Sequence, residues 1–392
     1  MPTASETRLS LHQDERGMAL AIALFAIVVI GALIAGTAFA GQMEMGGGRS
    51  AVAATQAVEQ AETGLSSVFD NWSQSWNNLA VQDSSTKVTT VSATGRDRYT
   101  TNVTRLGGLL YFVTSVGERL DASGNVLASR TLGQLARMTT PNISVNAAVK
   151  GEGNVSVGGT SSVSGIDTWP AGWGGSTCTQ PLVDVPGVKA SGSVTQNGAA
   201  TILGNNPGPY VASDPSVTPQ VFTDTYDALI GNVTMTLPSG TYNGMQPSLT
   251  MTSACNKSDL NNWGEPGDPD YPPVITNCKT YMPVILFTGN TTINTGKGQG
   301  IMIIQGDLNI QGTFIFDGII LATGNIDFHG AGGASSRIYG GLFSANSADV
   351  GDLIAIAGAP VITYSSCSIA AVLASAGTGI PLTHKGWVQV VY

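Results

Sequence analysis

The chain has 392 residues, of which 11% are charged and 50 are glycine, and its formal net charge is −9. This length exceeds one ordinary domain, so we expect a small N-terminal module followed by one or two larger units. The 17 Lys and Arg residues are scattered, which excludes the clustered basic surface of a nucleic-acid-binding protein. Gly, Ser, Thr and Asn separate short apolar clusters, a texture that predicts a β-rich protein.

The N-terminus contains a polar leader, residues 1–17, followed directly by an uncharged apolar run from Met18 to Ala40. At about 1.5 Å per residue in a helix, this run spans the roughly 30 Å hydrocarbon core of a bilayer. We therefore predict a transmembrane helix that continues as a stem, the two together occupying 18–68. A secretory signal peptide cut after the AFA that precedes Gly41 is the alternative.

A family resemblance follows from the order of these features. Arg16 and Gly17 close the leader, Met18 opens the span without a loop, and an Ala-Glu-x-Gly-Leu signature ends at Leu65. Over about Glu15 to Leu65, the chain resembles prepilins with a type III leader and the PilX N-terminal family of minor pilins. The resemblance implies that a prepilin peptidase cuts after Gly17, that Met18 becomes the methylated N-terminus, and that the chain joins other pilins through the pilus assembly machinery. The resemblance also implies that the chain is a single-pass inner-membrane protein before assembly and lies in the periplasm or in a cell-surface pilus after assembly.

One position departs from the pilin pattern. Most pilins carry glutamate at the fifth residue after the cut, whereas this chain carries Ile22. A carboxylate in lipid is costly without a partner, and in pilins it meets the N-terminal amine of the neighbouring subunit. Because Ile22 cannot make that filament-packing contact, we hypothesise a position at or near a filament tip. An anchored envelope protein that never polymerises is the alternative.

Three consecutive glycines, Gly46, Gly47 and Gly48, follow the span. Each costs about 1 kcal/mol relative to alanine in a helix interior. We therefore expect the helix to melt or kink here, either as a stem that unwinds on packing or as a plain linker.

Residues 69–140 have the pattern of a small α/β head. Alternating runs at Tyr99–Arg105 and Leu109–Val116 predict an antiparallel sheet that packs on the stem helix.

After Pro141 the sequence no longer shows long alternating runs, and residues 141–392 form a separate predicted unit. Apolar clusters of three or four residues, each bounded by Gly, Asn or Asp, recur at irregular spacing, as in Asn154–Val157 and Phe314–Phe316. Such clusters predict a β-solenoid, that is, a parallel β-helix, with a β-sandwich as the alternative. A less regular insertion, 168–282, interrupts the pattern. The predicted fold class is therefore α+β.

All four cysteines follow the membrane span, where an oxidising compartment permits disulfides. Cys255 and Cys278 bracket a loop without an apolar core of its own, so we predict that they form a disulfide. Cys178 and Cys367 are then the remaining pair. Four cysteines allow three pairings, so the assignment stays open at this point.

The loop between Cys255 and Cys278 is rich in oxygen-bearing side chains of the kind that calcium prefers. A calcium site is therefore one hypothesis, although the spacing is not that of an EF-hand. A plain loop held by its prolines, its glycines and the disulfide is the alternative, and no other cofactor is predicted. The candidate ligands are Asp259, Asn261, Glu265, Asp268 and Asp270.

Three tryptophans, Trp169, Trp173 and Trp263, lie in loops rich in Gly and Pro. Aromatic rings in such loops can stack on a surface polysaccharide. Capping of the open ends of the solenoid is the favoured alternative.

Asp307, Asp317 and Asp327 recur at equal intervals with His329 nearby. Acidic clusters on one sheet face occur in β-helical carbohydrate-active enzymes, which keeps that function as a third hypothesis. Asp307 and Asp317 each adjoin a glycine at an apparent turn, however, where aspartate is favoured by local hydrogen bonds.

We therefore expect no enzymatic activity. The leading hypothesis is a minor pilin that takes part in pilus assembly and in tip display or adhesion. A membrane-anchored protein that binds polysaccharide is the second hypothesis.

Overall fold

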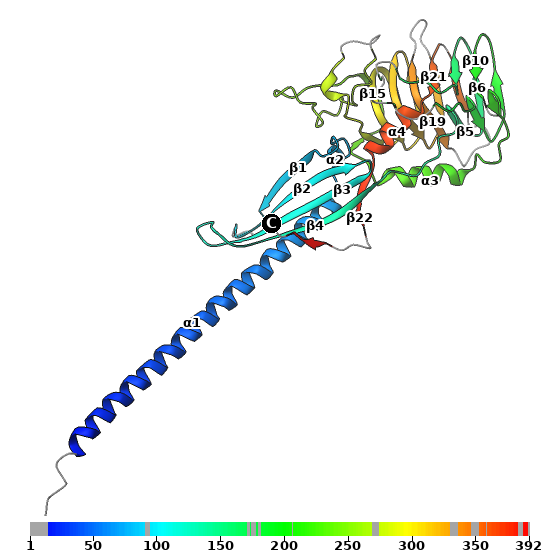
Figure 1. The fold of residues 1–392 in the computed structure, drawn as a ribbon. Coiled ribbons are helices and arrows are strands. Elements are labelled where there is room, and N and C mark those ends of the chain that lie inside the picture. The colour runs from blue at the N-terminus through cyan, green and yellow to red at the C-terminus, as the bar shows by residue number, and fades with distance from the viewer. Residues whose placement is uncertain are drawn as a thin grey trace, which may run out of the picture.

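The structure is a computed structural model that describes residues 15–90, 95–170, 173, 178, 182–205, 207–268, 274–329, 336–345, 353–357, 359–382 and 387–390. Figure 1 shows three parts: a long helix α1, a small sheet against its C-terminal half, and a large sheet beyond that. Helices and sheets are largely segregated along the chain, so the fold class is α+β, as predicted.

Helix α1 (Glu15–Asp70) is continuous from the apolar run into the head. Among the described residues it is the one helix long and apolar enough to cross a membrane. The predicted break at Gly46, Gly47 and Gly48 was wrong, because the helix runs through all three. Packing of its C-terminal turns on the head sheet outweighs the roughly 1 kcal/mol that each glycine costs.

The head contains an antiparallel sheet with the strand order β1-β2-β3-β4-β22, covered on one face by α1. Ala57, Ala61 and Leu65 recur every fourth residue and thus share the buried face of the helix. Short helix α2 (Gln74–Asn77) links α1 to the sheet. The first four strands, predicted from sequence as a small sheet, are β1 (Ser84–Thr90), β2 (Asp97–Gly107), β3 (Leu110–Leu120) and β4 (Val126–Thr139).

The C-terminal strands return to the head. Strands β22 (Thr378–Pro381) and β23 (Val388–Gln389) both pair with β4, and Thr378 lies opposite Thr139, 239 residues earlier. The boundary that assigned all of 141–392 to the β-rich unit was therefore wrong at its C-terminal end. The β-rich unit is instead inserted between β4 and β22 of the head.

The large sheet has 17 strands, and every pairing between its described strands is parallel. The β-sandwich alternative, which needs antiparallel sheets, does not fit these pairings. The strands are β5 (Val149–Glu152), β6 (Asn154–Val157), β7 (Ser162–Ser164), β8 (Val188–Ala190), β9 (Val194–Gln196), β10 (Thr201–Leu203), β11 (Tyr210–Val211), β12 (Met235–Leu237), β13 (Gly240–Met245), β14 (Val284–Phe287), β15 (Thr291–Ile304), β16 (Leu308–Gln311), β17 (Phe314–Ala322), β18 (Ile326–His329), β19 (Arg337–Ala345), β20 (Leu353–Ala357) and β21 (Val361–Tyr364).

The order of strands in space differs from their order in the chain. Strands β5, β6 and β7, the first after the head, pair with β19, β20 and β21, which are the last of this sheet. Their other neighbours are β8, β9 and β10. Strands β8 to β13 fall inside the predicted insertion 168–282. The prediction that this insertion interrupts the strand pattern was therefore wrong over much of its length.

Aligned apolar residues build the core between these strands. The register places Met302, Ile320, Leu342, Val149 and Val188 in one column across β15, β17, β19, β5 and β8. All five side chains are fully buried. A slip of one residue would turn each column towards the opposite face, so the column defines the register.

Glycines form a second column across β15, β17 and β19. Gly300, Gly318 and Gly340 are aligned, and their φ angles are 117°, 140° and 146°, respectively. A Cβ on Gly318 or Gly340 would overlap the carbonyl oxygen of the preceding glycine in the column. Only glycine combines this backbone conformation with this close approach.

Two helices pack on the large sheet. Helix α3 (Pro219–Ile230) begins with proline in its first turn and buries Phe222 and Leu229, and it contacts β19. Helix α4 (Ser366–Ser375) is capped by Ser365, whose side chain accepts from the Ser368 N–H, and contacts β15, β17 and β19. The 3₁₀ turn η1 (Thr276–Cys278) lies in the loop that follows β13.

Candidate functional site: the apolar stem and the stapled loop

The apolar half of α1 presents large side chains to its surroundings. Gly17 and Met18 lie in the first turns of α1, and the leader residues 1–14 lie outside the described part of the chain. Ile22 is 65% exposed. From Leu20 to Phe39 the large apolar side chains remain between 39% and 71% exposed, a surface that requires a membrane or partner helices to cover it.

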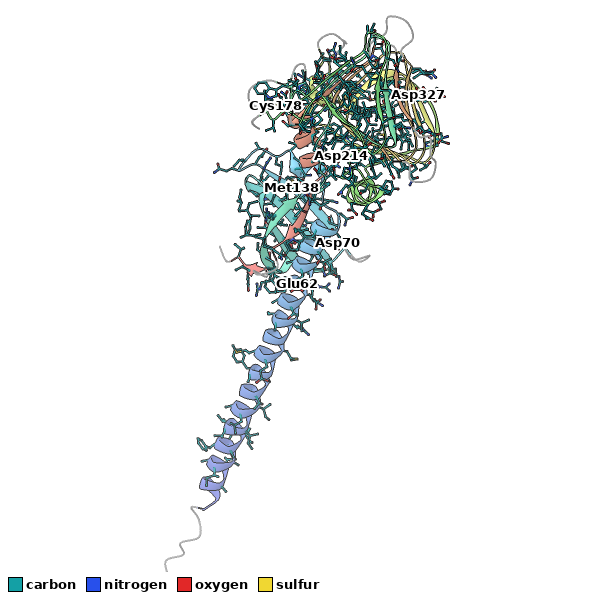
Figure 2. All side chains as sticks on the ribbon, turned by 90° about the vertical axis from the view of Figure 1, so that its right-hand side faces the viewer. Glu62, Asp70, Met138, Cys178, Asp214 and Asp327 are labelled. Atoms are coloured by element: carbon teal, nitrogen blue, oxygen red, sulfur yellow. A yellow bond between two sulfur atoms is a disulfide. The ribbon has the colours of Figure 1, made fainter. Side chains whose placement is uncertain are left out.

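The cysteines pair as the sequence indicated. Cys255 is bonded to Cys278, and Cys178 is bonded to Cys367. The first disulfide closes the loop after β13, and the second ties the segment before β8 to the first turn of α4. In Figure 2 Cys178 lies at the side of the large sheet, and its bond to Cys367 places it against α4.

Replacing Cys255 and Cys278 together by serine is expected to lower the free energy of unfolding by about 3 kcal/mol, because the bond closes a loop with a sequence separation of 23. The matched change at Cys178 and Cys367, with a separation of 189, is expected to cost about 5 kcal/mol. Thermal unfolding of the full-length protein in detergent measures both. Equal unfolding temperatures for wild type and both variants would contradict this prediction.

The described acidic residues of the stapled loop are not gathered into the predicted calcium site. Asp259 accepts from the Ser248 hydroxyl at 2.6 Å and from the Asn261 N–H at 2.9 Å, while the Asn261 side chain is exposed. Glu265 points into the protein, and Asp270 lies outside the described residues. Within the described ranges no three acidic, histidine or cysteine side chains come together to hold a metal. Asp259, Glu265 and Asp268 already have protein partners for their carboxylates, so the described part of the loop gives no support to the calcium hypothesis.

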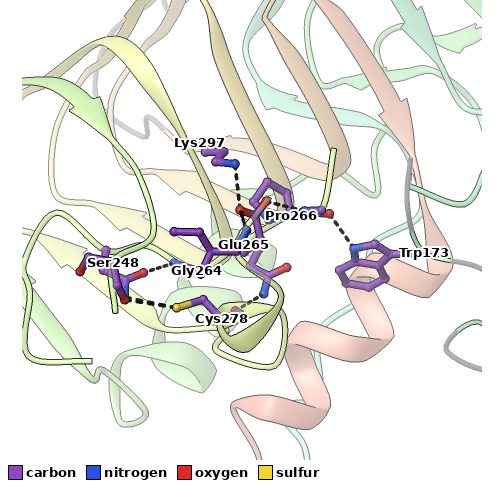
Figure 3. A network of polar contacts seen from close by, with 11 residues as sticks. Trp173, Ser248, Gly264, Glu265, Pro266, Cys278 and Lys297 are labelled. Atoms are coloured by element: carbon purple, nitrogen blue, oxygen red, sulfur yellow. Dashed lines mark hydrogen bonds and ion pairs between the residues drawn. The ribbon is translucent and has the colours of Figure 1, made fainter. Parts of the chain in front are cut away.

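Glu265 is instead half of a buried ion pair (Figure 3). Its Oε2 lies 2.8 Å from Nζ of Lys297 on β15, and the two side chains are 0% and 1% exposed. The Gly267 N–H donates to Oε1 at 2.8 Å, and the Ile275 N–H donates to Oε2 at 2.9 Å. Charged and backbone donors therefore satisfy both oxygens, as a buried carboxylate requires.

Another buried acid lies beside this pair. Asp317 of β17 is aligned with Gln299 of β15, and its side chain is almost fully buried. Burial raises the pKa of Asp317 well above its ordinary value, nearby Asp268 and Glu265 raise it further, and Arg337 opposes them. The prediction that Asp317 is a turn residue was wrong, because it lies inside a strand.

Ion pairs and hydrogen bonds join the loop to the sheet at several points. Arg337 of β19 pairs with Asp268 at 2.5 Å. The Gln299 side-chain amide donates to the carbonyls of Lys279 at 2.7 Å and Tyr281 at 3.0 Å. The loop thus contacts Lys297 and Gln299 of β15 and Arg337 of β19. Lys297 and Gln299 are two residues apart in the strand, so their side chains lie on the same face of the sheet.

Two of the three predicted ligand-stacking tryptophans are buried. Trp263 is 0% exposed and lies against Phe287 and Phe314 at ring distances of 5.6 and 6.4 Å. Trp173 is 8% exposed and donates from Nε1 to the Pro266 carbonyl at 2.9 Å. The stacking prediction was wrong for both, since each ring fills space in the protein. Trp169 remains 41% exposed.

The three aspartates singled out from the sequence do not form one cluster. Asp307 accepts from the Asn325 N–H at 2.8 Å, the turn role that its neighbouring glycine indicated. Asp327 is aligned with Asn309 of β16, whereas Asp317 is aligned with Gln299 and Tyr339.

The sequence reasoning missed Lys297 and Arg337. Each is a single cation within or beside an apolar strand, and a lone charge in such a strand is the signal that could have indicated a buried partner.

Comparison with known proteins gives one match. No protein-family model and no curated protein matches the sequence. Among solved structures, the chain is similar to the competence-associated pilin ComZ from Thermus thermophilus. The identity is 12%, the match covers 86% of this chain and 98% of that chain, and the TM-score is 0.23. A TM-score this low does not establish a common fold.

Proposed function

We propose that this chain is a minor-pilin-like subunit of a type IV pilus or pseudopilus, related to the PilX N-terminal family. In this role it takes part in pilus assembly and is displayed at or near the tip, where it contributes to adhesion. The observation that carries the proposal is α1: one helix whose N-terminal half is apolar and exposed and whose C-terminal turns, from Ala53 on, are built into the core of the head.

The exposed half of α1 fits two successive environments. The exposed half matches a bilayer before assembly and the stems of other pilins afterwards, because both supply apolar surface along its length. The buried half holds the head rigidly on the stem through Ala61, Leu65 and Val68. A single helix therefore connects the membrane to the exported part without a hinge.

The N-terminal residues support processing and a specialised position. Gly17 and Met18 mark the cut by prepilin peptidase in this proposal, and the inner membrane holds the chain until it is assembled into the filament. Ile22 cannot supply the carboxylate that meets the amine of another subunit, so the chain suits a place where that contact is not made. The tip of a filament is such a place.

The large parallel sheet is the displayed part. We interpret it as a β-solenoid, since its strands pair in parallel with strands of adjacent turns and enclose one apolar core. Its insertion between β4 and β22 presents it on the side of the head away from the stem (Figure 1). We propose a binding role and no catalysis, with surface polysaccharide as the ligand class and exposed Trp169 as one contact.

Shear fractionation tests the proposal. Filaments sheared from cells and washed are expected to contain the full-size processed chain together with other pilins. As a control, a variant with Leu24, Phe25 and Ile27 changed to aspartate loses the apolar stem surface and is expected to be absent from the filament fraction. Recovery of the wild-type chain only in the membrane fraction, with pili present, would support the anchored alternative.

A further inference from the structure

Lys297 and Glu265 lie in the geometry from which a covalent bond can form. Lys297 Nζ is 2.8 Å from Glu265 Oε2, and neither side chain is more than 1% exposed. An amine held against a carboxyl group in one place gains the large advantage that intramolecular reactions have over bimolecular ones. Burial also disfavours the ionised pair, because removing two charges from water is costly, whereas an amide is neutral.

The backbone around Glu265 supplies the electrostatic help that acyl transfer needs. The N–H groups of Gly267 and Ile275 donate to the two carboxyl oxygens at 2.8 and 2.9 Å. Donors placed in this way stabilise the negative charge that develops on oxygen when a nucleophile attacks the carbonyl carbon.

A nearby acid can carry the proton. Asp317 is diagonal to Lys297 across the β15–β17 pairing, on the same face of the sheet, and its electrostatic environment includes Glu265. Burial raises the pKa of Asp317 well above its ordinary value, Asp268 and Glu265 raise it further, and Arg337 opposes them, so this carboxyl group favours its protonated form more than an exposed aspartate does.

We propose that Lys297 Nζ and Glu265 Cδ become joined by an isopeptide bond, with Asp317 as the proton-transfer group. A proton first passes from the Lys297 ammonium to the Glu265 carboxylate, which leaves a neutral amine and a carboxylic acid. The amine attacks Cδ, and Asp317 gives its proton to the departing hydroxyl and takes one from the nitrogen. One ammonium and one carboxylate thus yield one amide and one water, and no oxidant, reductant or cofactor is consumed.

The bond would anchor the stapled loop to β15. The Cys255–Cys278 disulfide closes the loop on itself, and the second disulfide ties α4 to the segment before β8. A Glu265–Lys297 bond joins the loop to the central strands, and it resists reduction. The proposal does not depend on the pilin-like function.

Peptide mass spectrometry of the full-length protein tests the proposal. The chain is reduced, alkylated and digested with trypsin, which removes both disulfides and cuts after free lysine. A bonded Lys297 resists cleavage, so we expect peptides 258–279 and 280–337 as one species, lighter by one water than their sum. A linear peptide 258–337, in which Lys279 and Lys297 are both uncut, has the same mass. The linked species is identified by two amino termini, Ser258 and Thr280, in its fragment spectrum.

Two variants sharpen the result. Lys297→Arg keeps a cation for Glu265, but its guanidinium is not deprotonated in proteins and cannot attack, so the linked species is expected to vanish. Lys189→Met removes a lysine from a separate ion pair with Asp214 and is expected to leave the linked species unchanged. Recovery of 258–279, 280–297 and 298–337 as separate peptides from wild type, with no doubly terminated species, would show an ion pair only.

Discussion

A Gly17→Trp variant is expected to keep its leader and to disappear from filaments. The leader holds Arg8, Asp14, Glu15 and Arg16, so an uncut chain carries charges at the cytoplasmic start of its membrane helix. Those charges cannot follow the helix into the apolar interior of a filament without large cost. Immunoblots of membrane and sheared fractions measure both effects, as a longer band and a loss from the sheared fraction.

Sequencing of the mature N-terminus distinguishes this outcome from the signal-peptide alternative. Cleavage after Gly17 leaves Met18 first, whereas cleavage after the AFA leaves Gly41 first and removes the apolar run. Gly31→Trp is the matched control, because nothing lies within 4 Å of a Cβ at Gly31 and it is far from the proposed cut. A Gly17→Trp protein with the same mature N-terminus as wild type would refute processing at Gly17.

Local patterns were sufficient to predict some features. The uncharged run from Met18 to Ala40 meets the length requirement of a membrane helix whatever follows it. Cys255 and Cys278 are close in sequence and flank a polar loop, so their pairing needs little long-range information. The strands of the head alternate clearly because one face of that sheet packs on α1.

Long-range pairing produced the errors. The pairing of Thr378 with Thr139 joins segments 239 residues apart, and a strand of four residues has too little pattern to reveal its partner. The large sheet is buried on its inner face, and β17 is buried throughout, so alternation fails there. Its strands also stack out of chain order, which explains why the apolar clusters recur without a fixed period.

The buried polar groups of the stapled loop were misjudged for a different reason. Composition places Glu265 and Asp268 in an acidic loop, and exposed acids there are consistent with calcium binding. Their partners, Lys297 and Arg337, come from strands β15 and β19 that only the fold brings near. Trp263 likewise lies in a glycine-rich loop by sequence, yet its large apolar surface is covered by Phe287 and Phe314.

The contact between α1 and the head sheet provides the second large expected effect. Gly117 of β3 lies directly under the helix, and a Cβ there would overlap the carbonyl oxygen of Ala57 and the backbone nitrogen of Ala61. Both contacts are with backbone, so no side chain can rotate away. Gly117→Ala is therefore expected to push α1 from the sheet and to lower the free energy of unfolding of the head by about 1–3 kcal/mol.

Hydrogen exchange of the full-length protein in detergent measures this effect locally. Amides of residues 51–70 are expected to exchange faster in Gly117→Ala, while those of β15 and β17 keep their wild-type rates. Gly107→Ala, in the same sheet with open space around its Cβ, is the matched control and is expected to exchange as wild type does. Equal exchange of 51–70 in both variants would mean that the helix does not depend on close contact with Gly117. Because α1 is also the proposed link to the membrane, loosening this contact is expected to weaken the mechanical connection between stem and displayed sheet.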